Sequence, residues 1–171
     1  MSEPERIAKR LARAGLCSRR DAERWIAAGR VRVDGTVLDT PAFTVTDRNR
    51  IEVDGKPLPD IDRPRLWLYH KPVEQMVTAR DPQGRPTVFD ALPKDMPRTV
   101  SVGRLDFMSE GLLLLTNDGG LARRLELPAN GWTRRYRARV HGMVDETRLA
   151  ELARGITVEG VHYGPIKARL E

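Results

Sequence analysis

The sequence has few of the residues that build disulfides, metal centres or redox sites. It contains 1 cysteine, Cys17, so neither a disulfide framework nor a cysteine-based zinc site can form within the chain. Its 3 histidines, His70, His141 and His162, lack the spacing of metal ligands. No glycine-rich phosphate loop or dinucleotide-binding fingerprint is present. We therefore expect no metal and no cofactor, and we expect Cys17 to be a small buried residue in a helix turn.

Long apolar runs are also absent, and none approaches the length that crosses a membrane. The first residues, Met1 to Glu5, contain no apolar segment of the kind found in signal peptides. Together with the single cysteine, these absences predict a protein of the reducing cytoplasm with no membrane partner.

The chain is instead rich in positive charge. Its 171 residues include 30 Lys and Arg against 24 Asp and Glu, which gives a net charge of +6. Hydrophobic residues make up 40% of the chain, enough for the core of one large domain or two small ones. The charge favours a polyanionic partner such as nucleic acid, although many basic proteins bind nothing specific.

The first part of the sequence, residues 1–56, predicts two short helices. Apolar residues recur at helical spacing over residues 4–14, so we expect a helix there. Ser18 and Asp21 stand in the positions of a capping box, which predicts a second helix running to about residue 28.

Strands are expected after the second helix. Val31 and Val33 alternate with arginines, as is typical of a half-buried strand, and Asp34-Gly35 predicts a tight hairpin turn. Apolar residues from Phe43 to Val53 predict one more strand pair.

Five arginines in this part could form one basic surface for phosphate groups. They are Arg19, Arg20, Arg24, Arg30 and Arg32. From the pattern alone, the alternative is an ordinary solvated face.

A linker and a second domain follow. The prolines and alternating charges of residues 57–64 predict a semi-rigid linker, so we place the domain boundary there. In residues 65–171, strands and helices interleave without strict alternation, which predicts an α+β fold with a mixed or antiparallel sheet. The continuous apolar run from Leu112 to Thr116 predicts a strand buried on both faces. Other strands are expected at residues 65–69, 76–78, 100–105, 134–140, 156–158 and from 162 onward, and helical turns or helices at 87–92, 121–127 and 145–155.

The most specific stretch is the run from Gly103 to Gly119. It places Asp106 close to Arg104 at the start of an apolar segment. A carboxylate among apolar residues needs a partner, which Arg104 can supply. Such an ionised aspartate could act as a nucleophile or base. The alternative is a structural ion pair at a strand end.

This run, GRLDFMSEGLLLLTNDG, resembles the catalytic signature of the pseudouridine synthases that modify bacterial ribosomal RNA, in the branch that carries an S4 domain. The resemblance implies isomerisation of a uridine to pseudouridine without a cofactor. It implies that Asp106 is the nucleophile or base, that Arg104 orients it, and that Tyr136 lines the site. The residues after the signature most resemble members that act on large-subunit RNA.

Residues 6–38 resemble an S4 domain, a small α/β module that binds structured RNA. The resemblance implies that the five arginines face ribosomal RNA. Arg80 and Arg85, in a turn-rich loop, are further candidates for phosphate contact, with solvated side chains as the alternative. A helix-turn-helix DNA reader is the competing analogy, which the strand after the second helix disfavours.

The chain departs from the family pattern at two places. The family usually has a glycine two residues beyond Lys71-Pro72, and Glu74 stands there instead, so a tight turn is not expected. The chain also ends at Glu171, before a further strand and a basic segment of the family's catalytic domain. We therefore expect a truncated piece that folds but is catalytically weak.

Three functions remain open from the sequence. The first is the synthase, with attack of Asp106 on C1′ or a glycal intermediate both possible. The second is a non-catalytic S4-type RNA-binding protein with a degenerate or truncated enzyme domain. The third is a glycoside hydrolase pairing Asp106 with Glu110, which an aromatic content of 5% disfavours. A monomer is the default expectation.

Overall fold

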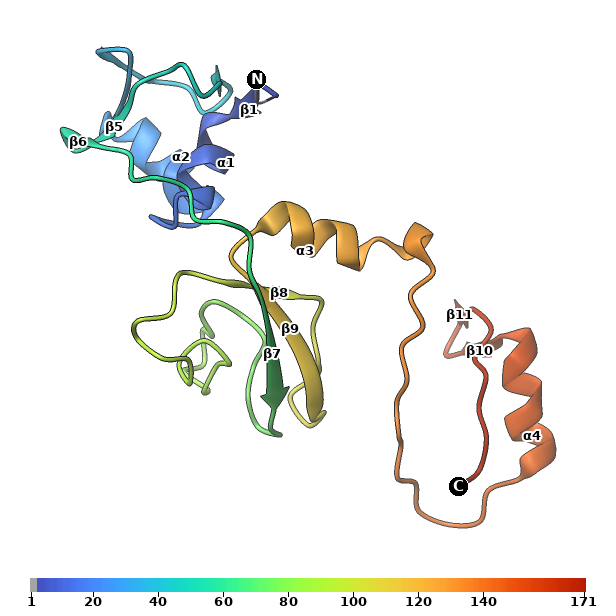
Figure 1. Ribbon diagram of the computed structural model, residues 1–171. Coiled ribbons are helices and arrows are strands. Elements are labelled where there is room, and N and C mark those ends of the chain that lie inside the picture. The colour runs from blue at the N-terminus through green and yellow to red at the C-terminus, as the bar shows by residue number, and fades with distance from the viewer. Residues whose placement is uncertain (1–2) are drawn as a thin grey trace. The chain divides into compact units, whose positions relative to one another are not determined.

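The computed structural model describes residues 3–171 (Figure 1). Residues 1 and 2, part of the segment in which no signal peptide is expected, lie outside that range. The chain divides into two compact units, the first ending at Trp132 and the second spanning Thr133–Glu171. Across the described range, no helix has both the length and the apolar character that a membrane span requires.

Two short helices begin the first unit, as predicted. α1 spans Ile7–Arg13 and α2 spans Arg19–Ala27. The capping box at the start of α2 is confirmed: Ser18 Oγ accepts from the Asp21 amide at 3.1 Å, and the Asp21 carboxylate accepts from the Ser18 amide at 3.2 Å. These bonds satisfy amide groups that a helix start otherwise leaves unpaired.

A four-stranded antiparallel sheet follows, in the order β3-β2-β5-β6. Its strands are β2 (Val31–Val33), β3 (Thr36–Val37), β5 (Ile51–Val53) and β6 (Lys56–Pro57). The predicted hairpin turn at Asp34-Gly35 is confirmed, with φ of +51° and +84° at these two residues. Positive φ at both central residues matches the twist of paired strands.

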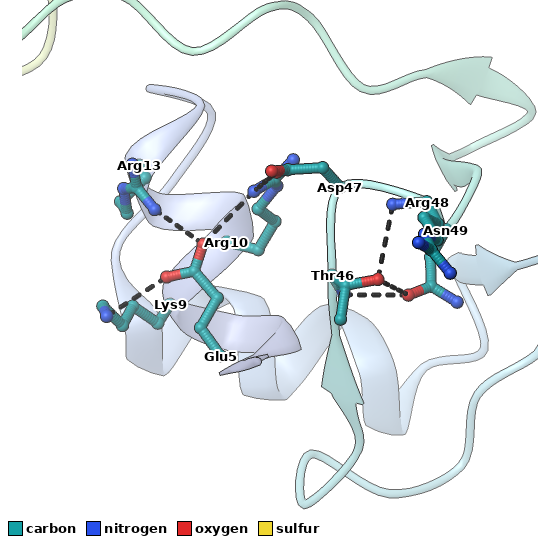
Figure 2. Close-up of polar contacts among 8 residues, drawn as sticks. All are labelled: Glu5, Lys9, Arg10, Arg13, Thr46, Asp47, Arg48 and Asn49. Atoms are coloured by element: carbon teal, nitrogen blue, oxygen red, sulfur yellow. Dashed lines mark hydrogen bonds and ion pairs between the residues drawn. The ribbon is translucent and has the colours of Figure 1, made fainter. Parts of the chain in front are cut away.

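The strand pair predicted between Phe43 and Val53 is wrong in its pairing. β4 (Thr44–Val45) lies antiparallel to β1 (Glu5–Arg6), whereas β5 pairs with β2 and β6. A turn separates β4 from β5, and in it the Thr46 amide donates to Asn49 Oδ1 at 2.8 Å (Figure 2). The alternation of apolar residues identified the strands, but it does not determine which strands pair with one another.

The helices and strands of this region share one apolar core. Its buried residues are Ile7, Ala8, Leu11, Cys17, Ala22, Ile26, Val31, Val33, Leu38, Val45 and Ile51. Cys17 is buried as predicted, but in the connection between α1 and α2 and not in a helix turn. Burial, and secondarily the charge of Asp21, raises the pKa of the Cys17 thiol to about 11.

We expect Cys17 to react with a disulfide reagent only after unfolding. The thiolate is the reactive form, and a thiol with a pKa of about 11 is almost wholly protonated at pH 8. The measurement is the rate of colour release from Ellman's reagent at pH 8, in native buffer and in guanidinium. A native rate within about tenfold of the unfolded rate would contradict the prediction.

The buried carboxylate of Glu5 holds three cations of α1 (Figure 2). Its oxygens lie 3.2 Å from Lys9 Nζ, 3.4 Å from Arg10 Nη1 and 2.7 Å from Arg13 Nη1. Arg10 also lies 2.8 Å from Asp47. Because a buried charge is stable only when paired, these cations serve the fold of the module.

A three-stranded antiparallel sheet, in the order β7-β9-β8, forms the centre of the next region. Its strands are β7 (Leu66–Lys71), β8 (Val100–Val102) and β9 (Gly111–Thr116). α3 (Gly119–Glu126) follows β9, and the Asp118 side chain caps it by accepting from two amides of its first turn. The α+β architecture with an antiparallel sheet is therefore as predicted.

The prediction that β9 is buried on both faces is wrong. Leu113 and Leu115 are buried, in a core with Val77 and Val88. Leu112, on the opposite face, is 65% exposed. Successive side chains of a strand point to opposite faces, and an antiparallel sheet can leave one face open.

The strand predicted at residues 76–78 and the helical turns predicted at 87–92 are not regular elements. Met76 forms an isolated parallel bridge with Thr87, and residues 89–91 form only turns. Thr87 does cap its turn: its Oγ1 accepts from the Asp90 amide at 3.3 Å, and the Asp90 side chain accepts from the Thr87 amide at 2.8 Å. No helix continues because a proline, Pro93, disfavours helical geometry in the residue before it.

The second unit contains a helix and a hairpin, as predicted. α4 (Glu146–Glu151) is capped by Asp145, whose Oδ1 accepts from the Thr147 amide at 2.9 Å. β10 (Ile156–Val158) pairs with β11 (Val161–Tyr163). The strand predicted at residues 134–140 is wrong, because in the described part of the chain no backbone is paired with it and strand formation depends on such neighbours.

Candidate active site

Asp106 lies in the connection between β8 and β9, residues 103–110, which we call the Asp106 loop. The loop begins at Gly103 and is followed by Gly111, the first residue of β9, and both glycines have positive φ, +71° and +122°, a conformation that glycine adopts without steric cost. The Gly103 amide donates to Glu126 Oε1 at 2.7 Å, which ties the loop to α3. The Ser109 amide donates to the Asp106 carbonyl at 3.0 Å, so a turn presents the Asp106 side chain to solvent.

The predicted ion pair between Arg104 and Asp106 is not formed. Both side chains are exposed, and no ion pair joins them within residues 3–171. Leu105, between them, packs against the apolar core beneath the sheet. Pairing of two exposed charges gains only about 0–1 kcal/mol, too little to impose one arrangement.

Lys71 is the cation that the structure brings to the Asp106 loop, and sequence reasoning missed it. It ends β7, and its side chain is fully buried. Its ammonium donates to the carbonyls of Pro72 at 2.9 Å, Asp106 at 3.0 Å and Ser109 at 2.7 Å. Burial lowers the pKa of Lys71, and the nearby negative charge of Asp106 partly offsets this. The available signal was a lysine that continues an apolar strand just before a proline.

The chain turns tightly after Lys71 although no glycine is present, contrary to our prediction. Glu74 has φ of +63°, and its amide donates to the Phe107 carbonyl at 2.7 Å. The left-handed conformation costs about 1–2 kcal/mol for a residue with a side chain. The hydrogen bond to the Asp106 loop offsets part of that cost.

Asp81 and Arg85 close the neighbouring loop. Asp81 accepts from Arg85 Nε at 3.1 Å, from Arg85 Nη2 at 2.9 Å and from the Arg85 amide at 2.9 Å. The side-chain hydrogen bonds from Arg85, more than any other cause, lower the pKa of Asp81 to about 2. The Arg85 guanidinium is thus already paired, and its predicted contact with RNA phosphate stays a prediction.

The Asp81–Arg85 pair should stabilise the protein only while Asp81 is ionised. Because the folded pKa of about 2 lies below the ordinary value of 3.8, the contribution is complete above pH 3.8 and is lost as the pH falls through 2. We therefore expect the difference in free energy of unfolding between the parent and Asp81→Asn to shrink from about pH 4 to pH 2. Urea unfolding at several pH values measures it. The exposed Asp95→Asn is the control, and a pH-independent difference for Asp81→Asn would contradict the prediction.

Two of the five predicted RNA-binding arginines of the first part are already paired. Arg24 forms an ion pair with Asp21. Arg30 contacts Asp54 through its Nε at 2.9 Å and its Nη2 at 2.5 Å, and its guanidinium lies 4.8 Å from the Trp25 ring centre. Competition with these partners would weaken any phosphate contact of Arg24 or Arg30.

The other three, Arg19, Arg20 and Arg32, are exposed and have no ion-pair partner within residues 3–171. Arg19 and Arg20 begin α2, where the helix dipole adds positive potential. Arg80 is likewise exposed and forms no ion pair in the described range. Of the seven predicted RNA-binding arginines, these four are the ones that form no ion pair in the described range.

Tyr136 lies in the second unit, in a segment without regular structure, and is 71% exposed. Its place beside a target base stays a prediction. Among residues 3–171, no cluster of three or more His, Cys, Asp or Glu side chains could hold a metal ion.

Two protein families match the chain. Residues 5–51 match the S4 domain, and residues 65–163 match the RNA pseudouridylate synthase family. An uncharacterized RNA pseudouridine synthase of Rickettsia conorii is 46% identical over 165 residues, covering 96% of this chain and 71% of that protein. Ribosomal large subunit pseudouridine synthase B of Salmonella typhi is 45% identical over 161 residues, covering 91% of this chain and 55% of that protein.

A solved structure supports the fold. It is the crystal structure of a pseudouridylate synthase, which is 23% identical in sequence and aligns with a TM-score of 0.55. The alignment covers 94% of this chain and 70% of the chain in that structure. The family is shown by the match over residues 65–163 and by relatives above 40% identity. The chain belongs to the RNA pseudouridylate synthase family and carries an S4 domain before its synthase domain.

Proposed function

We propose that this chain isomerises a uridine of large-subunit ribosomal RNA to pseudouridine, with Asp106 as the reacting carboxylate. The observation that carries the proposal is the geometry of the Asp106 loop. The main chain around Asp106 is held by Lys71, Glu74 and Glu126, while the Asp106 side chain itself is exposed. A fixed backbone that presents a carboxylate to solvent suits attack on a sugar that arrives from outside.

The reaction makes modest chemical demands. The bond between uracil N1 and ribose C1′ breaks, the uracil turns, and C5 bonds to C1′. The C5 hydrogen leaves as a proton and N1 takes up a proton from solvent, so the product is an isomer of the substrate. One ionised carboxylate beside the ribose is needed, either to attack C1′ or to take a proton from C2′. Asp106 supplies it by either route.

The target uridine must also leave its helix, which costs a few kcal/mol. Arg104, two residues before Asp106, would occupy the space that the base vacates. Tyr136 would stack on the extruded base, an interaction worth about 1–3 kcal/mol. Arg19, Arg20, Arg32 and Arg80 would bind phosphates and supply the remaining free energy.

Membership of the synthase family does not favour the alternative of a non-catalytic RNA-binding protein. It equally disfavours a glycoside hydrolase. Action on ribosomal RNA implies the cytoplasm as the compartment, and a monomer remains our expectation.

Tritium release tests the proposal. Unmodified large-subunit ribosomal RNA labelled with [5-³H]uridine is incubated with the chain, and we expect one equivalent of tritium to be released per modified site. The same RNA labelled at C6 should retain its tritium, which controls for degradation. Binding without release would overturn the proposed activity. Release from small-subunit RNA alone would overturn the substrate and keep the activity.

A further inference from the structure

Two loops far apart in the sequence meet at the ring of Phe107. The guanidinium carbon of Arg85 lies 5.7 Å from the ring centre. A cation over an aromatic face at this distance is attracted by the ring's quadrupole. Phe107 directly follows Asp106, so this contact bears on the residue that the proposed function places at the reacting ribose.

The Arg85 guanidinium that lies over the ring is held in place by Asp81. The Asp81 side chain is only 2% exposed and binds Arg85 through two side-chain nitrogens. It also accepts from the Gln83 amide at 3.2 Å, so the carboxylate is held by its own loop. A planar guanidinium bound at two points has one orientation, which a lysine ammonium could not reproduce.

Phe107 is held at two ends. Its carbonyl accepts from the Glu74 amide at 2.7 Å, and its ring lies under Arg85. The peptide between Asp106 and Phe107 carries the Asp106 carbonyl, which accepts from Lys71 Nζ and from the Ser109 amide, each at 3.0 Å. With the carbonyls of Asp106 and Phe107 both bound and the ring under Arg85, this peptide has little freedom to rotate. The direction of the Asp106 side chain follows from the direction of that peptide.

We propose that Asp81 and Arg85 are positioning residues, which orient the Asp106 carboxylate by holding the Phe107 ring. This inference rests on the proposed function, in which Asp106 reacts. It assigns to Arg85 a role inside the protein and not a contact with RNA phosphate. A small error in the placement of a reacting group lowers turnover steeply without weakening binding of the substrate.

The test compares turnover with binding in the Arg85→Lys variant, which keeps the charge but loses the two-point contact. We expect kcat to fall about ten- to a hundredfold, while KM and the Kd for RNA stay within about twofold of the parent values. Arg123→Lys, the same chemical change at an exposed position of α3, is the matched control and should leave kcat unchanged. Thermal unfolding of each variant gives the folded fraction at the assay temperature.

A double variant separates positioning from general destabilisation. Phe107→Leu removes the ring and should lower kcat to a similar extent. If both residues act through one contact, the combined variant should lose no more than the larger single loss. Losses that multiply would overturn the proposal.

Hydrogen exchange gives a readout that does not depend on catalysis. The Ser109 amide, bonded to the Asp106 carbonyl, should exchange faster in Arg85→Lys than in the parent. If the parent releases no tritium, the proposed function fails, yet this comparison still decides whether Arg85 orders the loop. Unchanged exchange would overturn the inference. The inference would also be overturned if Arg85→Lys raised KM, left kcat unchanged, and made the dependence of RNA affinity on salt concentration shallower by about one unit. That result would mark Arg85 as a phosphate contact.

Discussion

Replacing Asp106 by asparagine is expected to abolish tritium release from [5-³H]uridine-labelled RNA, by a factor of at least about 10³. Asparagine has the size of aspartate but no negative charge, so it can neither attack C1′ nor accept a proton from C2′. The Asp106 side chain is exposed, and the fixed contacts of the loop are made by its main chain. The fold should therefore be unaffected, with the free energy of unfolding within about 0.5 kcal/mol of the parent.

The control for this substitution is Glu110→Gln, which neutralises another exposed carboxylate at the end of the same loop. We expect Glu110→Gln to retain activity, since the proposed reaction needs only one carboxylate. RNA binding by both variants is measured by filter retention across a salt series. Residual release by Asp106→Asn near the parent rate would show that Asp106 is not the reacting group. Loss of activity in both variants would revive a two-carboxylate mechanism.

Replacing Lys71 by methionine is expected to be the most destabilising single change near the site. Methionine fills a similar volume but donates no hydrogen bond. The carbonyls of Pro72 and Ser109 would lose the ammonium that binds them, and the Asp106 carbonyl would keep only the Ser109 amide. A buried acceptor without a partner costs about 1–3 kcal/mol. Removing the buried ammonium recovers some desolvation free energy, so we expect a net loss of roughly 2–4 kcal/mol in the free energy of unfolding.

Urea unfolding at neutral pH measures the effect of Lys71→Met, and Lys94→Met provides the control. Lys94 is exposed and has no hydrogen-bond or ion-pair partner in the described part of the chain, so its replacement should change stability by less than about 0.5 kcal/mol. In the fraction of Lys71→Met that stays folded, kcat should fall because the Asp106 loop is no longer held. Equal stability of the two variants would mean that the carbonyls find other partners.

Features set by neighbouring residues could be predicted from the sequence. The capping box of Ser18 and Asp21 and the hairpin turn at Asp34-Gly35 depend on a few consecutive residues, and both are confirmed. The position of Asp106 between two strands followed from the signature, whose length made the resemblance specific.

Features set by distant residues could not be predicted. The partner of β4 and the open face of β9 depend on which elements pack nearby, information that alternation of apolar residues does not carry. The same holds at the site. Arg104 was expected to pair with Asp106 because the two are close in sequence, yet the buried contact comes from Lys71, 35 residues earlier. Arg85 was assigned to RNA without knowledge that Asp81 already binds it.

The contact between Lys71 and the Asp106 carbonyl also links assembly of the site to folding. It joins residues 35 apart in the chain, and Lys71 takes its position only once β7 has paired with β9 along Leu66 to Lys71. Contacts of this separation form late, because the entropy of closing the intervening chain must be overcome first. A nascent or partly unfolded chain therefore holds no ordered Asp106 loop. The Asp106 loop becomes ordered in the same cooperative step that completes the central sheet. Incompletely folded molecules would therefore not modify RNA.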